Sequence, residues 1–321
     1  MIDSALVPTR SGPPGMAGES RDLAEPARLY LASLAPSGRR SQAAALERIA
    51  RFVSNDQLGW RELPWGRLGY REAAAVVDWL KATYASPATA NTYRAALRGV
   101  ARECWRLGLI DAEQHARIRD LPPITGSREP RGRALTSEER RRLIDQLERE
   151  GTLAAVRDIA LIGVLYSSGG VRVSEAVALR LEDWNPRERS LTLVGKGNKE
   201  RSVWLPDDAA ADLERWLRAR GSAPGFLMPP IASDRVTVLH HRPLSASTVR
   251  ALCGRLARRV GIEHFTPHDF RRSSISDLID DSGDLALVAR IAGHAQTPTT
   301  AKYDRRPEAA MRRAARRLSV R

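Results

Sequence analysis

Residues 266–303 read TPHDFRRSSISDLIDDSGDLALVARIAGHAQTPTTAKY. The segment opens with the signals of a helix start, because Thr266 can cap the first turn and Pro267 suits the first helical position. His268 and Arg271 are three residues apart, so a helix brings both side chains to one face. The rest of the chain is organised around this helix and the turn that follows it.

A second histidine and a tyrosine complete the segment. His294 follows a glycine in a predicted turn between helices, and Tyr303 comes nine residues later. A guanidinium matches two phosphate oxygens, an imidazole can donate to phosphate or move a proton near neutral pH, and a phenol can form a covalent ester. Together these groups suit a site that holds and attacks a phosphodiester. Taken alone, His268 and Arg271 are more typical of a solvated helix face.

The composition points to a polyanionic partner. The 321 residues include 52 basic and 38 acidic side chains, for a formal charge of +14. This charge indicates nucleic acid, with a membrane surface as the competing polyanion. The sequence has no apolar run of about 18 residues and no signal-peptide pattern, so we expect a cytoplasmic protein without a membrane segment. Cys104 and Cys253 are expected to be small core residues in a reducing compartment.

Composition also divides the chain into four stretches. Residues 1–25 are rich in Pro, Gly and Ser and predict a disordered leader. Residues 26–121 are helical in pattern throughout, and residues 122–134 carry the prolines, glycines and charges of a linker. Residues 135–321 contain further helical patterns and one β-hairpin pattern. The expected fold is therefore mainly α with a small β-sheet.

One predicted helix of the first domain, residues 89–105, begins a row of arginines at every fourth position. The row consists of Arg94, Arg98, Arg102 and Arg106. Such a row is usually a solvated helix face. The alternative, in a chain this basic, is a row that follows a DNA phosphate backbone.

A glycine pair precedes a further candidate arginine. Gly169 and Gly170 end an apolar helix and allow the backbone to approach a ligand closely. Arg172 follows and opens a predicted helix whose apolar positions extend to Leu181. Glu175 lies three residues after Arg172 and is placed to orient it. The alternative is an ordinary surface Arg–Glu pair.

Residues 191–205 read LTLVGKGNKERSVWL, which is the pattern of a β-hairpin. Only four of the 52 basic residues are lysine, and two of these, Lys196 and Lys199, lie in this one turn. Arginine does not release its proton near neutral pH, whereas lysine can be tuned to do so. A proton donor for a leaving alkoxide must therefore be lysine. Lys196 is the candidate and Lys199 the alternative.

Five motifs occur in a fixed order: Arg172, the Gly-Lys-Gly hairpin, His268-Asp-Phe-Arg271, Gly293-His294 and Tyr303. In this order and spacing the sequence resembles the tyrosine recombinase, or phage integrase, family over about residues 26–321. The resemblance implies a helical, SAM-like core-binding domain over 26–121 and an α-rich catalytic domain over 135–321. Two departures stand out: Arg272 occupies a position where the family often has histidine, and Gly-Val-Arg replaces the usual Gly-Leu-Arg.

The resemblance also implies how the phosphate is held. Arg172 and Arg271 would bind the non-bridging oxygens of the scissile phosphate, and His294 would donate a hydrogen bond to the same group. Glu175 would orient Arg172 without contacting the phosphate itself. These residues would stabilise the extra negative charge of pentacoordinate phosphorus.

Covalent catalysis is implied by the same resemblance. Tyr303 would attack phosphorus and form a 3′-phosphotyrosyl bond, His268 would help to move the nucleophile's proton, and Lys196 would protonate the 5′-hydroxyl that leaves. A 5′-hydroxyl from another duplex would then rejoin the strand, so no metal, ATP or other cofactor is implied. The sequence accordingly lacks a P-loop and a carboxylate cluster suited to Mg²⁺.

The implied partner is double-stranded DNA, bound by a homotetramer on two duplexes and hence at the nucleoid. Residues 308–321 carry an amphipathic stripe, which is expected either to pack on a neighbouring subunit or to dock on its own domain. The short leader favours a simple two-domain, Xer-like recombinase of a mobile element or a chromosome-resolution system. Two alternatives stay open: a DNA-binding protein without chemistry, and a type IB topoisomerase-like enzyme that rejoins the same strand.

Overall fold

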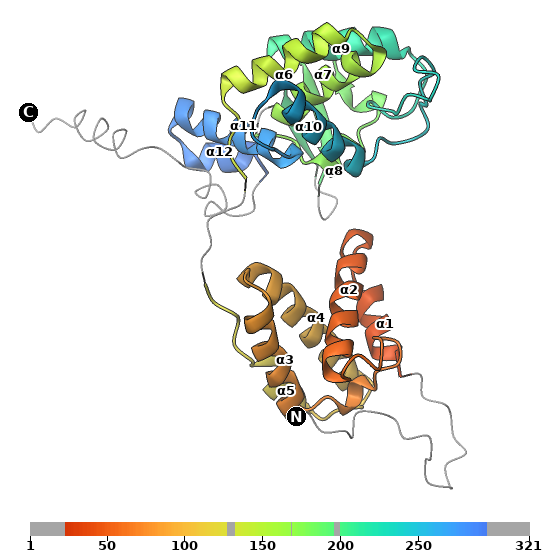
Figure 1. Ribbon diagram of the computed structural model, residues 1–321, viewed down its shortest axis with the longest axis vertical. Coiled ribbons are helices and arrows are strands. Elements are labelled where there is room, and N and C mark those ends of the chain that lie inside the picture. The colour runs from red at the N-terminus through yellow and green to blue at the C-terminus, as the bar shows by residue number, and fades with distance from the viewer. Residues whose placement is uncertain (1–22, 127–131, 168, 196–199, 294–321) are drawn as a thin grey trace, which may run out of the picture. The chain divides into compact units, whose positions relative to one another are not determined.

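The computed structural model describes residues 23–126, 132–167, 169–195 and 200–293. These residues are mainly helical and form one three-stranded sheet, as the sequence predicts (Figure 1). It divides into two compact units, Met1–Pro130 and Arg131–Arg321. The division falls inside the stretch 122–134 that the sequence marks as a linker. The predicted leader lies almost entirely outside the described residues.

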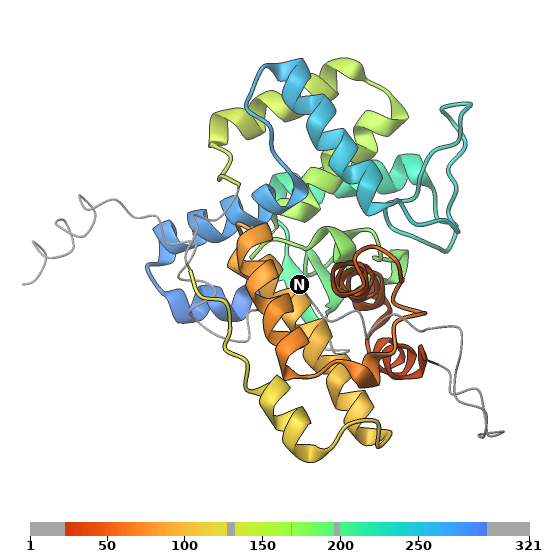
Figure 2. The same cartoon turned by 60° about the horizontal axis from the view of Figure 1, so that its bottom comes forward.

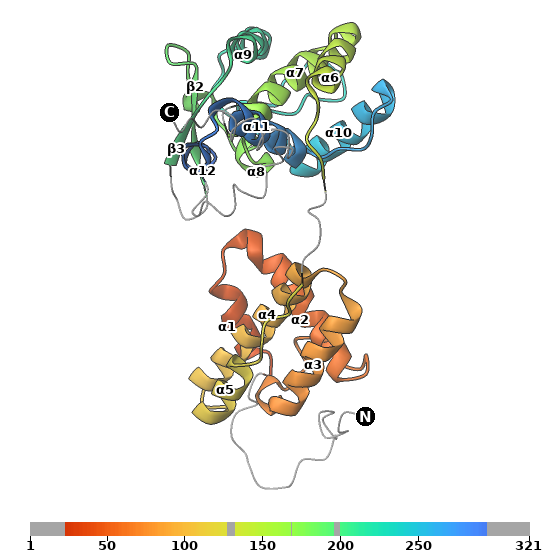
Figure 3. The same cartoon turned by 90° about the vertical axis from the view of Figure 1, so that its left-hand side faces the viewer.

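The first unit is a helical bundle built around α4, which contacts α1, α2, α3 and α5 (Figure 3). Its core is formed by apolar residues at helical spacing, such as Leu46 and Ile49 on α2 and Leu97 and Val100 on α4. The elements of this unit are α1 (Glu25–Ala32), α2 (Pro36–Val53), the 3₁₀ turn η2 (Trp65–Arg67), α3 (Tyr70–Thr83), α4 (Pro87–Arg106) and α5 (Ala112–Arg119).

The sequence pattern predicts Thr89 as the N-cap of helix α4. The N-cap is Ser86, three residues earlier, and its side chain accepts a hydrogen bond from the backbone N–H of Thr89. Pro87 then occupies the first helical position, where a backbone N–H would have no partner within the helix, so its absence costs no hydrogen bond. The Ser-Pro pair therefore starts this helix as well as separating it from α3.

The arginine row on α4 is tied to the protein itself. The Arg94 guanidinium is half-buried and its Nε lies 3.0 Å from the carbonyl oxygen of Leu121. Arg102 and Arg106 both pair with Glu103, whose side chain is 7% exposed. The prediction of a simple solvated face is therefore wrong for Arg94, which fastens the end of the unit to its central helix.

The central helix of the second unit is α7, which packs against α6, α9 and α11. The strands β2 and β3 lie at one side of the unit, away from α6 and α10 (Figure 3), and α11 and α12 contact each other (Figure 2). The helices are α6 (Ser137–Glu150), α7 (Leu153–Tyr166), α8 (Val173–Ala176), α9 (Asp207–Arg220), α10 (Ala246–Val260), α11 (Pro267–Ser282) and α12 (Leu285–Ile291). The remaining elements are the 3₁₀ turn η3 (Leu181–Asp183) and the strands β1 (Trp184–Asn185), β2 (Ser190–Val194) and β3 (Glu200–Trp204).

The predicted hairpin is confirmed as β2 and β3, which pair antiparallel with Leu193 opposite Arg201. Leu191, Leu193 and Val203 are buried, so one face of the hairpin joins the core of the unit. Because side chains alternate along a strand, Arg201 lies on the same face as Val203. This register places a charged side chain on the inner side of the sheet.

Two local predictions differ in their outcome. The sequence Thr136-Ser-Glu-Glu139 predicts a capping box at the start of α6. The structure confirms it: Thr136 accepts from the N–H of Glu139, and the Glu139 carboxylate accepts from the N–H of Thr136. The helix predicted to run from Arg172 to Leu181 is wrong in length, because α8 ends at Ala176. No helix among the described residues has the length and apolar character needed to cross a membrane.

Candidate active site

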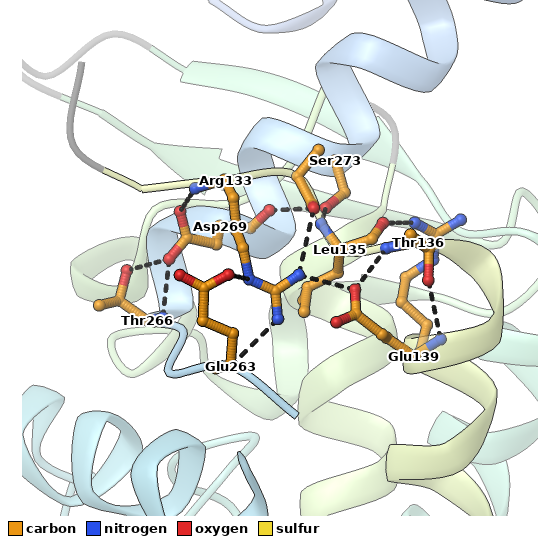
Figure 4. Close-up of polar contacts among 10 residues, drawn as sticks. Arg133, Leu135, Thr136, Glu139, Glu263, Thr266, Asp269 and Ser273 are labelled. Atoms are coloured by element: carbon orange, nitrogen blue, oxygen red, sulfur yellow. Dashed lines mark hydrogen bonds and ion pairs between the residues drawn. The ribbon is translucent and has the colours of Figure 1, made fainter. Parts of the chain in front are cut away.

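Asp269 fixes the start of α11. Its carboxylate accepts from the backbone N–H and the hydroxyl of Thr266, at 2.8 and 2.9 Å, so Asp269 and not the threonine side chain caps the helix. The same carboxylate accepts from the backbone N–H of Arg133 at 3.1 Å (Figure 4). Although Asp269 is 3% exposed, its charge is met by donors from two segments.

The segment before α6 is laid along the first turns of α11 by further bonds. The N–H of Leu135 donates to the Ser273 hydroxyl at 2.7 Å, and that hydroxyl donates to the carbonyl of Asp269 (Figure 4). Arg133 adds a bond of 2.7 Å to Glu139 and one of 3.1 Å to the carbonyl of Glu263. The helix that carries His268 and Arg271 is therefore held in place from outside its own sequence.

Arg271 is buried, at 1% exposure. Its Nη1 donates to the carbonyl of Gly170, and its Nη2 donates to the carbonyl of Ala292 at 2.7 Å. Gly170 has φ +63°, and a Cβ there would lie 2.5 Å from the Cα of Arg271, so only glycine allows this approach. Arg271 thus joins α11 to the end of α12 and to the segment that leads into Arg172. The interpretation of this helix face as solvated is therefore wrong for Arg271.

Arg172 is the N-cap of α8 and is held by Glu175. The Glu175 carboxylate accepts from Nη1 of Arg172 at 2.9 Å and from its backbone N–H at 2.8 Å. The Glu175 side chain is 6% exposed, whereas the Arg172 side chain is 44% exposed. An ordinary surface pair would expose both partners, so the buried carboxylate here acts as a fixed support for an accessible guanidinium.

His268 lies on the exposed side of α11. Its pKa is lowered from the ordinary value, first by partial burial of the ring against the protein and then by the neighbouring charges of Arg272, Arg271 and Arg172, against the opposing effect of Asp269. His268 and Arg271 lie on one helix, and Arg271 donates to the carbonyl of Gly170, two residues before Arg172, so the three basic residues lie in one neighbourhood. A neutral imidazole at neutral pH can accept a proton.

For the strand cleavage that the family resemblance implies, the lowered pKa of His268 predicts the response to acid. A histidine with a lowered pKa stays neutral to a lower pH, so strand cleavage should keep its rate down to about pH 6.5 and decline only below it. Single-turnover cleavage measured between about pH 5 and pH 8 checks this, with His268→Gln as the control that lacks the acid decline. A decline centred above about pH 6.5 in the wild-type chain would contradict it.

Arg272 stands where the resembling family often has histidine. It is 4% exposed, and its Nε lies 3.6 Å from the Asp269 carboxylate. The residue therefore adds to the charge balance around the capping carboxylate. Its guanidinium also helps to keep the pKa of His268 low.

The structure brings Arg172, Glu175, His268 and Arg271 together from α8 and α11. The other three predicted site residues, Lys196, His294 and Tyr303, lie outside the described residues. Sequence reasoning missed one member of the cluster. The Arg201 Nη2 donates to Glu175 at 2.8 Å. The sequence did contain one indication of this residue: Arg201 falls at a position where the alternation of apolar and polar residues along the strand predicts a buried side chain.

Sequence comparison places the chain among known proteins. Residues 133–309 match the model of the phage integrase family. The chain is 33% identical to tyrosine recombinase XerC of Chromohalobacter salexigens, over 81% of this chain and 82% of that protein. It is 30% identical to tyrosine recombinase XerD of Pseudomonas aeruginosa, over 80% of this chain and 78% of that protein.

Solved structures share the fold. A XerH site-specific recombinase bound to palindromic difH substrate in a post-cleavage complex aligns with a TM-score of 0.64 and 22% identity, covering 87% of this chain and 79% of that one. The Tn1549 transposon integrase in complex with transposon right end DNA aligns with a TM-score of 0.63 and 17% identity, covering 92% and 98%. The family model covers more than half of the chain, and the XerC match covers most of it. The chain therefore belongs to the phage integrase family, the family of the tyrosine recombinases.

Proposed function

We propose that this chain is a site-specific DNA recombinase that cuts and rejoins strands through a 3′-phosphotyrosyl intermediate. The observation that carries the proposal is the shared anchoring of the two arginines. Arg271 donates to the carbonyl of Gly170, two residues before Arg172, and the Glu175 carboxylate accepts from the Arg172 guanidinium. Two guanidiniums held in this way suit the two non-bridging oxygens of one phosphate.

The first chemical step forms one bond and breaks one. The Oη of Tyr303 attacks phosphorus, and the bond from phosphorus to the 5′-oxygen breaks. The phenol proton passes to His268, whose lowered pKa keeps it neutral and able to accept. Lys196 gives a proton to the departing 5′-oxygen. Arg172, Arg271 and His294 stabilise the charge that builds on the phosphoryl oxygens.

The second step reverses the first with a new partner. A 5′-hydroxyl from another duplex attacks phosphorus and gives its proton to the neutral Lys196. The bond from phosphorus to the Tyr303 oxygen breaks, and His268 returns the proton to the phenol. The energy of the broken phosphodiester is kept in the protein–DNA ester, so the exchange runs without ATP, and the cationic side chains stand in place of a metal ion. We propose that four copies act on two DNA duplexes, with residues 308–321 packing on the neighbouring copy.

Support for DNA as the partner comes from charge and from relatives. The formal charge of the chain is +14, which favours a polyanion. The XerH recombinase and the Tn1549 integrase, which share this fold, are bound to DNA in their solved structures. A chain that acts on cellular DNA in this way works in the cytoplasm at the nucleoid.

A nicked duplex containing the recognition site tests the proposal. The nick lets the short 5′-strand diffuse away after cleavage, so the adduct accumulates. We expect the protein to become attached to the 3′-phosphate through Tyr303, and added duplex with a free 5′-hydroxyl to receive the strand. No adduct would identify a DNA-binding protein without chemistry. An adduct that rejoins only its own strand would identify a type IB topoisomerase-like enzyme.

Lys196→Ala is expected to slow cleavage of an ordinary phosphodiester by about 10²–10⁴-fold, the usual contribution of a general acid. A substrate with sulfur in the 5′-bridging position has a leaving group that needs no proton, so the variant should cleave it at close to the wild-type rate. Single-turnover rates on the two substrates measure this, with Lys199→Ala as the matched control. A variant equally slow on both substrates would rule out the proton-donor role.

A further inference from the structure

We infer that Arg201 is a positioning residue for the reaction: from β3 it holds Glu175, and through Glu175 it fixes the guanidinium of Arg172. The inference rests on the proposed recombinase function and adds to it a residue that acts on the phosphate through Glu175 and Arg172. Arg201 acts through Glu175, so its effect depends on Arg172 being present.

Both oxygens of Glu175 are occupied by two arginines. Oε1 accepts from Nη1 of Arg172 at 2.9 Å, and Oε2 accepts from Nη2 of Arg201 at 2.8 Å. Oε2 also accepts from the backbone N–H of Arg172 at 2.8 Å. The carboxylate therefore cannot rotate without breaking a bond to one arginine or the other. The buried Glu175 carboxylate thus joins β3 to α8.

Arg201 also reaches the turn after α12. A Cβ built on Gly293 would lie 2.8 Å from the Nε of Arg201 and 2.9 Å from its Cδ. Gly293 has φ +64°, a conformation that favours glycine. The Arg201 side chain thus packs against the residue directly before His294. From β3, this one side chain contacts two other segments of the site, α8 and the turn after α12.

Stability does not explain an arginine at this position. The neighbours on this face of the hairpin, such as Leu191, Leu193 and Val203, are buried and apolar. The Arg201 side chain is 16% exposed, and its Nη1 is buried with no hydrogen-bond partner among the described residues. Burial lowers the pKa of this guanidinium, against the opposing effect of Glu175. A buried ion pair can often be replaced as a whole by apolar side chains without loss of stability, so the pair of Arg201 with Glu175 is weak evidence for a purely stabilising role.

The positive charge of Arg201 also affects the electrostatic field that Arg172 presents to a phosphate. A single Glu175 carboxylate facing Arg172 alone would cancel most of the positive field that Arg172 presents to a phosphate. With Arg201 on the other oxygen, the three groups together keep a net charge of one positive unit. Arg201 therefore lets Glu175 hold Arg172 firmly without neutralising it.

The test compares Arg201→Met with the wild-type chain on the nicked duplex. Methionine keeps the length of the side chain and removes the charge and the donors. We expect adduct formation to slow by about 10–100-fold, as for loss of a group that orients a reacting one. The unfolding midpoint should fall only modestly, because the buried Glu175 carboxylate keeps its two bonds to Arg172. DNA affinity should change by less than about threefold. Arg201→Lys, which keeps the charge without the planar fork, should restore the rate only in part.

Two further measurements separate positioning from a general loss of structure. In the double variant Arg172→Ala/Arg201→Met, the Arg201 change should add no further loss, because its route through Arg172 is gone. A substrate whose non-bridging oxygen is replaced by methyl carries no phosphate charge, so the rate ratio between wild type and Arg201→Met should shrink on it. The matched control is Arg215→Ala on α9, an arginine 2.9 Å from Glu148 with no bond to Glu175, and it should keep the wild-type rate.

The outcomes are distinct. Arg201→Met reacting within twofold of wild type, or slowing the Arg172→Ala background as much as it slows wild type, would overturn the inference while the recombinase function stands. A wild-type chain that forms no adduct on its recognition site would instead overturn the proposed function. Equal losses on the charged and the methylated substrate would also overturn the role of Arg201, because they would indicate a structural defect.

Discussion

A Tyr303→Phe variant is expected to form no covalent adduct with a nicked duplex, a loss of at least about 10⁴-fold against the wild-type chain. The change removes a single oxygen atom, and that atom is the one that the proposed mechanism joins to phosphorus. DNA binding is spread over many phosphate contacts, so the affinity should change by less than about twofold.

Denaturing electrophoresis of a single-turnover reaction measures the adduct, and a binding titration at the same salt concentration measures the affinity. Tyr70→Phe is a suitable control, since Tyr70 is 48% exposed at the start of α3 and takes no part in the proposed site. This control should react as wild type does. Adduct formation at the wild-type level by Tyr303→Phe would place the nucleophile elsewhere in the chain.

Arg172→Ala is expected to lower the rate of adduct formation by about 10²–10³-fold, the effect of removing one preorganised donor from a developing oxyanion. The fold should survive the change. The Arg172 side chain is 44% exposed, and Glu175 keeps its 2.8 Å bond to Arg201 when the arginine at 172 is gone. The loss should therefore appear in the chemical step and not in the unfolding midpoint.

The measurement pairs single-turnover cleavage with thermal unfolding and DNA binding. Arg180→Ala is the control, because Arg180 lies just after α8 and forms an exposed pair with Glu182 at 2.9 Å. It should retain both rate and stability, since exposed pairs contribute little. If Arg172→Ala cleaved within tenfold of wild type, the phosphate would have to be held mainly by other groups.

Arg271 shows how far a sequence pattern can predict a site. The pattern identifies the residue, because His-Asp-Phe-Arg follows a helix-start signal at a recognisable distance from the other motifs. It does not predict that the guanidinium is 1% exposed and bound to the carbonyls of Gly170 and Ala292. Those partners are 101 and 21 residues away in the chain. Their contact depends on how α11 packs against α7 and α12.

The same limit applies to Asp269 and Arg201. Asp269 is recognisable as a first-turn acid on α11, but its bond to Arg133 spans 136 residues. Arg201 is recognisable only as a charge on an otherwise apolar strand face, and its bond to Glu175 spans 26 residues. The positions of Lys196, His294 and Tyr303 stay predictions, because these residues lie outside the described part of the chain.

The sequence by itself determined the mainly helical class, the hairpin of β2 and β3, the capping box of α6 and the family, because each depends on residue types at short or fixed spacing. Hydrogen-bonded turns and side-chain periodicity act over a few residues, so they are legible in the chain. Only the tertiary structure decided that Glu175 is shared by two arginines and that Arg271 and Asp269 fasten distant segments. Such contacts form when separate elements bury one another, and burial is set by the packing of the whole unit.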